Sequence, residues 1–156
     1  MTLVRSDSGF WPRESLLRLL AYAVWPPTEE RALAVLADGS AAGAVSLYLA
    51  ADGKDLAGLL RMRRTGRRSA EITHIAVVPE RRRGGLGRAM IEELLQLERL
   101  DEVVAETDGD AVGFYRRCGF DVHSLGEQYP GVERFRCALR RRGQPAWASS
   151  GAKDGP

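Results

Sequence analysis

The sequence has few cysteines, almost no lysine and no long apolar run, and each scarcity excludes a class of protein. Its two cysteines show no CxxC spacing, which excludes a disulfide scaffold and argues against a zinc site. No apolar stretch approaches the roughly eighteen residues that cross a bilayer, and the N-terminal residues lack the apolar centre of a signal peptide. We therefore expect a cytoplasmic protein with free thiols and no membrane partner.

Arginine supplies nearly all of the positive charge, because lysine occurs only at positions 54 and 153. The planar guanidinium group grips phosphate at two points, although a general bias toward arginine codons would give the same excess. The net charge of +2 is too small to indicate nucleic acid on its own. A length of 156 residues with 44% hydrophobic and 28% charged residues is typical of one globular domain.

Hydrophobic periodicity predicts an α/β or α+β domain with a mixed sheet. Helices are expected within 12–37, interrupted at Pro26-Pro27, and over 86–100 and 111–117, with Asp108 or Asp110 as the cap of the last. Strands are expected at 44–50, 56–63, 70–78, 102–106, 120–123 and 133–139. Leu94 and Leu97 lie on the apolar stripe of the 86–100 helix and are predicted core residues. We expect a domain over 1–140 and a disordered tail over 141–156.

The most informative segment, Arg82 to Gly87, joins the third of these strands to the 86–100 helix. Its glycines let backbone N–H groups approach a ligand, and the first N–H groups and the dipole of the helix favour an anion such as pyrophosphate. No Lys-Ser/Thr pair follows the glycines, and Met90 stands where the dinucleotide consensus needs its third glycine. The segment instead matches R/Q-x-x-G-x-G/A at every fixed position. The alternative is an ordinary solvated basic turn.

Two separate motifs in one order make the chain resemble the GNAT superfamily, the acetyl-CoA-dependent N-acetyltransferases. The run AEITHIAVVPERRRGGLGRAMIEELL resembles the acetyl-CoA motif of that family, and ETDGDAVGFYRRCGF resembles its second motif. The resemblance implies a mixed, mostly antiparallel central sheet of about six to seven strands, flanked by about four helices. It also implies an acyltransferase that uses acetyl-CoA as cosubstrate, with no metal.

The first motif carries the residues that the resemblance assigns to the acetyl group, the pantetheine arm and the pyrophosphate of acetyl-CoA. Backbone groups of Ile75, Ala76 and Val77 correspond to the strand that binds the acetyl carbonyl and the pantetheine arm. The residues that correspond to the pyrophosphate loop are Arg82, Arg83, Gly84, Gly85, Leu86, Gly87 and Arg88.

The second motif and the strand before the loop carry the residues implied for the chemistry. Tyr115 corresponds to the tyrosine that protonates the departing CoA thiolate, and Glu71 to the general base of some members. Asp108 stands where an asparagine often contacts pantetheine, although an ionised aspartate cannot donate a hydrogen bond. Ala111 and Phe114, on the same helix as Tyr115, complete the cofactor-binding set.

Each of these residues also has a structural interpretation. Glu71 can equally be interpreted as a strand carboxylate that pairs with arginine. The alternative for Tyr115 is a buried structural tyrosine. His74 and His123 are interpreted as packing or supporting residues. Cys118 lacks a neighbouring base and is interpreted as a packing residue, not as an acetyl-cysteine nucleophile.

The acceptor of the acetyl group is the least determined part of the hypothesis. We expect a primary amine of a small molecule or of a protein, which attacks the thioester directly in a ternary complex. The enzyme is expected to be a monomer or homodimer. The residues we expect near it are Trp11, Tyr22, Trp25 and a 124–132 loop with Tyr129. One alternative function is a non-catalytic CoA-binding regulatory module. A weaker alternative is nucleic-acid binding through arginines. The residues concerned are Arg61, Arg63, Arg64, Arg67, Arg68 and Arg81 to Arg83. This alternative is weaker because no aromatic residues, on which bases could stack, are interleaved among them.

Overall fold

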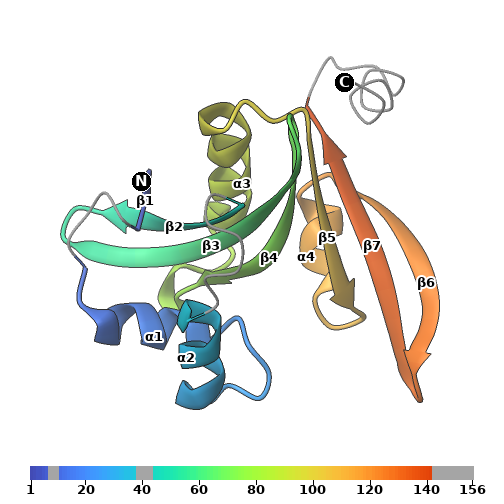
Figure 1. The fold of residues 1–156 in the computed structure, drawn as a ribbon, viewed down its shortest axis with the longest axis horizontal. Coiled ribbons are helices and arrows are strands. Elements are labelled where there is room, and N and C mark those ends of the chain that lie inside the picture. The colour runs from blue at the N-terminus through green and yellow to red at the C-terminus, as the bar shows by residue number, and fades with distance from the viewer. Residues whose placement is uncertain (7–10, 38–43, 142–156) are drawn as a thin grey trace. The chain divides into compact units, whose positions relative to one another are not determined.

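The computed structural model describes residues 1–6, 11–37 and 44–141, which divide into two compact units (Figure 1). The first comprises Met1–Arg63 and Ile72–Leu94, and the second Arg64–Glu71 and the residues from Leu95 onward. The first seven elements are β1 (Thr2–Arg5), α1 (Arg13–Ala21), α2 (Glu29–Ala37), β2 (Val45–Asp52), β3 (Asp55–Gly66), β4 (Ser69–Val77) and α3 (Leu86–Leu97). They are followed by β5 (Glu102–Asp108), α4 (Val112–Arg117), β6 (Asp121–Tyr129) and β7 (Val132–Arg140).

Seven strands form one sheet in the order β1-β2-β3-β4-β5-β7-β6. The pairs β1–β2, β2–β3, β5–β7 and β6–β7 are antiparallel, and β4–β5 is parallel. With four α-helices among the described residues, this confirms the predicted mixed, mostly antiparallel α/β fold. No helix in the described ranges is both long and apolar enough to cross a membrane.

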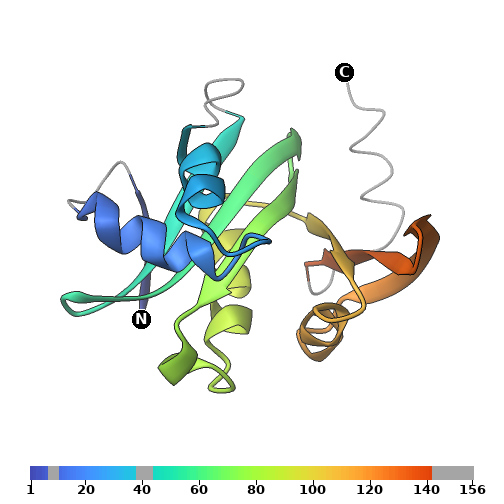
Figure 2. The same cartoon turned by 90° about the horizontal axis from the view of Figure 1, so that it is seen from below.

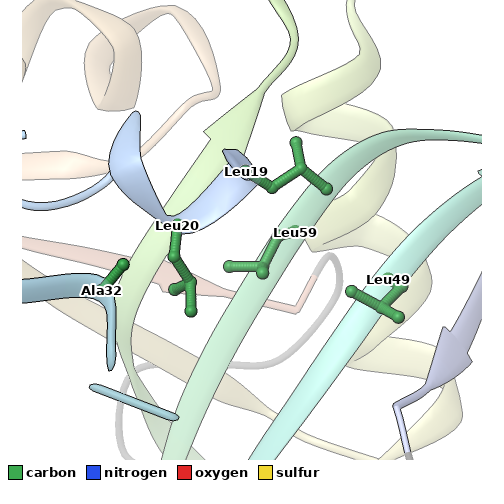
Figure 3. Packing of buried hydrophobic residues seen from close by; sticks show 5 residues of the cluster. All are labelled: Leu19, Leu20, Ala32, Leu49 and Leu59. Carbon is green, nitrogen blue, oxygen red and sulfur yellow. The ribbon is translucent and has the colours of Figure 1, made fainter. Parts of the chain in front are cut away.

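In the first unit, α1 and α2 cover one face of the strands and α3 covers the other (Figure 2). Leu49 on β2 is the cross-strand partner of Leu59 on β3. Both pack against Leu19 and Leu20 of α1 and Ala32 of α2, as the close view shows (Figure 3). Burying each such leucine contributes roughly 1.5–3 kcal/mol, so this cluster fixes the two N-terminal helices on their face of the sheet.

On the other face, Gly58 lets α3 approach β3 closely. A Cβ atom at Gly58 would lie 2.8 Å from the Met90 sulfur and 2.9 Å from the Ala76 carbonyl oxygen. Such distances are shorter than van der Waals contact, so only glycine fits without a shift of its neighbours. Met90 and Leu94 of α3 are fully buried, as the apolar stripe predicts.

The predicted extension of this helix to residue 100, with Leu97 in the core, was wrong. The helix ends at Leu97, whose side chain is 52% exposed. Arg99 takes a left-handed φ of 53°, and the Leu100 N–H donates to the Leu95 carbonyl at 2.9 Å. This is the hydrogen-bond pattern of a helix C-terminal cap, and it buries Leu100 in place of Leu97.

In the second unit, β6 and β7 form a longer hairpin than predicted. Pairing continues from Asp121 opposite Ala138 to Tyr129 opposite Val132, with bulges on the way. The predicted 124–132 loop is therefore wrong: residues to Tyr129 belong to β6, and only a tight turn at Gly131 (φ 78°) separates it from β7. The strand β1 was not predicted as an element. Residues 142–156, which contain the predicted tail, lie outside the described residues.

Candidate functional site

The turn between β4 and α3 leaves the start of the helix ready to bind an anion. A short 3-10 turn, Pro79–Arg81, follows β4. Arg83 then takes a left-handed φ of 66°, and Gly85 one of 81°. The Ala89 N–H donates to the Gly85 carbonyl at 3.0 Å, which makes Gly85 the residue before the helix. The N–H groups of the three residues between them, Leu86, Gly87 and Arg88, therefore have no intrahelical acceptor.

The two glycines before the helix are not crowded by other parts of the protein. A Cβ atom added at Gly85 would meet no atom within 4 Å. One added at Gly84 would meet only the Arg81 carbonyl oxygen, at 3.7 Å. Protein packing therefore gives no reason for glycine at Gly84, whereas the close approach of a ligand does. The turn fits a pyrophosphate, because the space, the backbone donors and the helix dipole coincide.

Three of the arginines around this turn differ in how they are held. Arg81 forms an ion pair with Asp52 of β2, and the hydrogen bond from Arg81 lowers the pKa of Asp52. Arg88 pairs with Glu92 one turn along α3 at 3.1 Å, and both side chains are well exposed. Arg83 makes no hydrogen bond or ion pair with any described residue. It is the arginine whose charge is most available to an incoming phosphate.

Arg82, the first fixed residue of the motif, is held at two points. Its Nε donates to the Val77 carbonyl at 3.0 Å. Its guanidinium carbon lies 5.2 Å from the centre of the Tyr22 ring, a cation–π contact. All three residues belong to the first unit. The hydrogen bond from Arg82 Nε occupies the Val77 carbonyl, and Val77 is one of the residues whose backbone the resemblance assigns to the acetyl and pantetheine end.

The remaining predicted residues of β4 lie in different units. Ile75, Ala76 and Val77 belong to the first unit, with Ala76 buried and the other two half-buried. Glu71 belongs to the second, where it is half-buried and registers with Val104 of β5. The structure therefore groups the predicted strand backbone with the glycine turn, and Glu71 with the elements of the second motif.

Asp108 organises the start of α4. Its Oδ1 accepts hydrogen bonds from the backbone N–H groups of Asp110 at 3.0 Å and Ala111 at 3.1 Å. The prediction that Asp108 or Asp110 caps the helix was wrong: the N-cap is Ala111, without a side-chain capping hydrogen bond, and Asp108 holds the turn before it. Ala111 is the residue before the helix and not its first residue, since α4 begins at Val112. One oxygen of the carboxylate expected near pantetheine is therefore committed to the turn.

Tyr115 lies in an aromatic stack inside the second unit and is only 6% exposed. Its ring meets those of Phe114 and Phe120 edge to face, each with centroids 5.1 Å apart. Burial, and to a smaller extent the neighbouring Cys137 and Cys118, raises the pKa of Tyr115 well above its usual range. The phenol is therefore protonated at neutral pH, the form in which it could donate a proton.

The cysteine and the two histidines considered in the sequence analysis differ in their burial. Cys118 is buried, in agreement with a packing role. His74 is half-buried, with Nδ1 3.1 Å from the Thr73 hydroxyl. His123 is exposed on β6, so its interpretation as a packing residue was wrong. Within the described ranges, no group of three or more histidine, cysteine, aspartate or glutamate side chains is arranged to hold a metal ion.

Together, these features define a protein with a mixed α/β sheet and, between a strand and a helix, a turn whose backbone donors suit a pyrophosphate-containing ligand. Residues 43–122, more than half of the chain, match the family described as the acetyltransferase (GNAT) domain. The chain therefore belongs to the GNAT acetyltransferase family, and the predicted acyltransferase class is confirmed with it. No curated protein sequence matches the chain.

Solved structures share the whole fold at low sequence identity. An aminoglycoside 6'-N-acetyltransferase complexed with coenzyme A is 15% identical, with a TM-score of 0.74 over 93% of this chain and 99% of its own. A spermidine N-acetyltransferase mutant from Vibrio cholerae is 18% identical, with a TM-score of 0.64 over 90% and 95%. An acetyltransferase from Bacillus subtilis in complex with CoA is 20% identical, with a TM-score of 0.61 over 89% and 97%. At these identities the likeness establishes the fold alone.

Proposed function

We propose that this protein is an N-acetyltransferase that transfers the acetyl group of acetyl-CoA to a primary amine in a ternary complex. The observation that carries the proposal is the open turn at Gly84-Gly85 before α3, in a chain of this family. Relatives of the same fold support the cosubstrate and the acceptor class, since two were solved with CoA and two are named for spermidine and aminoglycosides. The acceptor is a small-molecule or protein amine.

The pyrophosphate would be held by backbone N–H groups of Leu86, Gly87 and Arg88 and by the charge of Arg83. The backbone of Ile75 to Val77 would hold the acetyl and pantetheine end. The family resemblance also assigns Asp108, Ala111 and Phe114 to cofactor binding. Acetyl-CoA supplies an acetyl group activated as a thioester. Preorganised N–H donors stabilise the negative charge that develops on its carbonyl oxygen.

Proton transfer would fall to Glu71 and Tyr115. A lysine-like amine has a pKa of about 10.4 and must lose a proton before it can attack. Glu71 accepts that proton, directly or through water, while the amine nitrogen forms the new C–N bond. Tyr115 gives its proton to the sulfur as the C–S bond breaks, which leaves free CoA and an amide. General acids of this type contribute roughly 10²- to 10⁴-fold.

Two observations favour this function over the alternatives. A CoA-binding regulatory module would need neither Tyr115 nor Glu71, and both are present. Nucleic-acid binding is less well supported because two arginines of that set are already paired within the protein, Arg64 with Glu98 at 2.5 Å and Arg68 with Asp101 at 2.6 Å. The two buried free cysteines agree with a reducing cytoplasm. We retain one domain over 1–140, acting as a monomer or homodimer.

The test is calorimetric titration with acetyl-CoA, followed by a screen of amines for release of free thiol. We expect saturable micromolar binding that is lost in an Arg82→Ala, Gly85→Glu double variant. An accepted amine should then give thiol release that Tyr115→Phe slows without loss of acetyl-CoA binding. Absence of binding at millimolar acetyl-CoA would refute the proposal.

A further inference from the structure

The cation–π contact between Tyr22 and Arg82 links two segments whose cooperation the sequence does not indicate. Tyr22 is the C-terminal capping residue of α1, and its side chain is 46% exposed. Arg82 lies much later in the chain, between the 3-10 turn and the left-handed Arg83. A half-exposed tyrosine of the N-terminal helices thus contacts the first fixed residue of the phosphate-binding motif.

This contact completes a set of restraints on Arg82. The backbone N–H of Arg82 donates to the Pro79 carbonyl at 3.3 Å, and its Nε donates to the Val77 carbonyl at 3.0 Å. A free arginine side chain samples many rotamers, and holding it in one conformation opposes that entropy. The Tyr22 ring covers the guanidinium face that the hydrogen bond leaves open, and stacking on an aromatic face suits the planar group.

A fixed Arg82 side chain also fixes the backbone that follows it. Arg83 adopts a left-handed conformation that a non-glycine residue takes only when its surroundings hold it there. Arg82 is the residue immediately before it, and its anchored side chain is one such restraint. The same backbone leads into Gly84 and Gly85, which are not crowded by other parts of the protein.

We propose that Tyr22 is a positioning residue of the acetyl-CoA loop. Its ring holds Arg82 against Val77, so that Arg83 and the N–H groups at the start of α3 are arranged before pyrophosphate arrives. The inference rests on the proposed function, because it names how the same site is preorganised. It differs from the expectation that Tyr22 forms a wall of the acceptor site, because the affected ligand is acetyl-CoA and not the amine.

The test is the dissociation constant of acetyl-CoA, measured by calorimetry for wild type, Tyr22→Leu, Tyr22→Phe and Arg82→Ala. An exposed cation–π contact predicts a roughly two- to fivefold weaker affinity for Tyr22→Leu. Tyr22→Phe keeps the ring and should bind as wild type does. Leu97→Ala is the control, since it removes an exposed apolar side chain at the opposite end of α3 from Arg82. Its acetyl-CoA affinity should not change.

A double-variant cycle separates positioning from a general loss of structure. Tyr22→Leu should weaken binding in the wild-type background and have no further effect in the Arg82→Ala background. Additive effects would overturn the inference, as would a change confined to the KM of the amine. Should Tyr22→Leu fail to fold, Tyr22→Met carries the same test. If wild type itself does not bind acetyl-CoA, the proposed function fails; if it binds and Tyr22→Leu binds equally well, only the inference fails.

Discussion

Gly85 and Gly53 form a matched pair that separates backbone strain from ligand contact. Both take left-handed φ angles, 81° for Gly85 and 68° for Gly53, and a Cβ atom added at either meets nothing within 4 Å. Replacement by alanine should therefore lower the free energy of unfolding by a similar amount, about 1–2 kcal/mol for a left-handed L-residue. The two positions differ in place: Gly85 precedes α3, whereas Gly53 forms the β2–β3 turn.

Only Gly85→Ala should weaken acetyl-CoA binding. Its new methyl group enters the space through which a phosphate reaches the N–H groups of α3. A hydrogen bond to a charged group contributes about 1.5–3 kcal/mol, so the loss of one such bond weakens binding roughly ten- to hundredfold. Gly53→Ala should keep the wild-type dissociation constant, because the β2–β3 turn supplies none of the proposed pyrophosphate donors, although the neighbouring Asp52 pairs with Arg81.

The assay combines thermal unfolding with calorimetric titration, both done on the three proteins side by side. For a chain of this size, 1 kcal/mol lowers Tm by roughly 2–4 °C, so both variants should unfold a few degrees below wild type. Saturating acetyl-CoA should raise the Tm of wild type and Gly53→Ala, and much less that of Gly85→Ala. The reasoning is refuted if the two variants bind acetyl-CoA equally well, or if only one of them is destabilised.

Three further predictions concern packing and proton transfer. Gly58→Ala should lower the free energy of unfolding by about 1–3 kcal/mol in urea denaturation, because the new Cβ meets Met90 and the Ala76 carbonyl; a change below about 0.5 kcal/mol contradicts this. Asp108→Asn keeps the Oδ1 acceptor and should leave Tm unchanged, whereas Asp108→Ala loses two hydrogen bonds of the turn before α4 and should lose about 1 kcal/mol; equal Tm values would exclude this role of Asp108. Tyr115→Phe should lower kcat about 10²-fold at an unchanged acetyl-CoA dissociation constant. Burial raises the pKa of Tyr115, so the folded state keeps a proton that the unfolded chain loses near pH 10. The free energy of unfolding of the wild type should therefore fall above about pH 10. The part of this fall that is due to Tyr115 should be absent in Tyr115→Phe.

The elements that the sequence predicts well are those with a buried face of their own. The β4 strand and the start of α3 carry apolar residues at regular spacing and lie where expected. The β6 strand could not be delimited in this way, because almost all of its residues are exposed and its length is set by pairing with β7. The end of α3 was missed because Arg99 adopts the left-handed capping conformation without the usual glycine signal.

The candidate site was predictable in position but not in its supports. The spacing of Arg82, Gly85 and Gly87 identified the turn, since the turn needs glycine where the chain bends left-handed or approaches a ligand. The partners of its arginines, Tyr22 and Asp52, come from distant elements. Nothing in a tyrosine at the end of α1 or an aspartate at the end of β2 indicates such a contact. Only the folded sheet brings them to the loop.

The burial of Tyr115 bears on how a phenol can serve as the acid for a thiolate. In water a thiol has a pKa of about 8.5 and a phenol about 10, so proton transfer from tyrosine to thiolate is slightly uphill. Burial raises the pKa of Tyr115 further, which makes it a weaker acid in isolation. The same desolvation also raises the pKa of a thiol placed beside it, because both groups are neutral when protonated and charged when not. What matters for the reaction is the difference between the two, and a shared apolar environment of Phe114 and Phe120 shifts both in one direction. The aromatic stack therefore does not disqualify Tyr115 as the acid; it keeps the phenol protonated until a more basic sulfur is beside it.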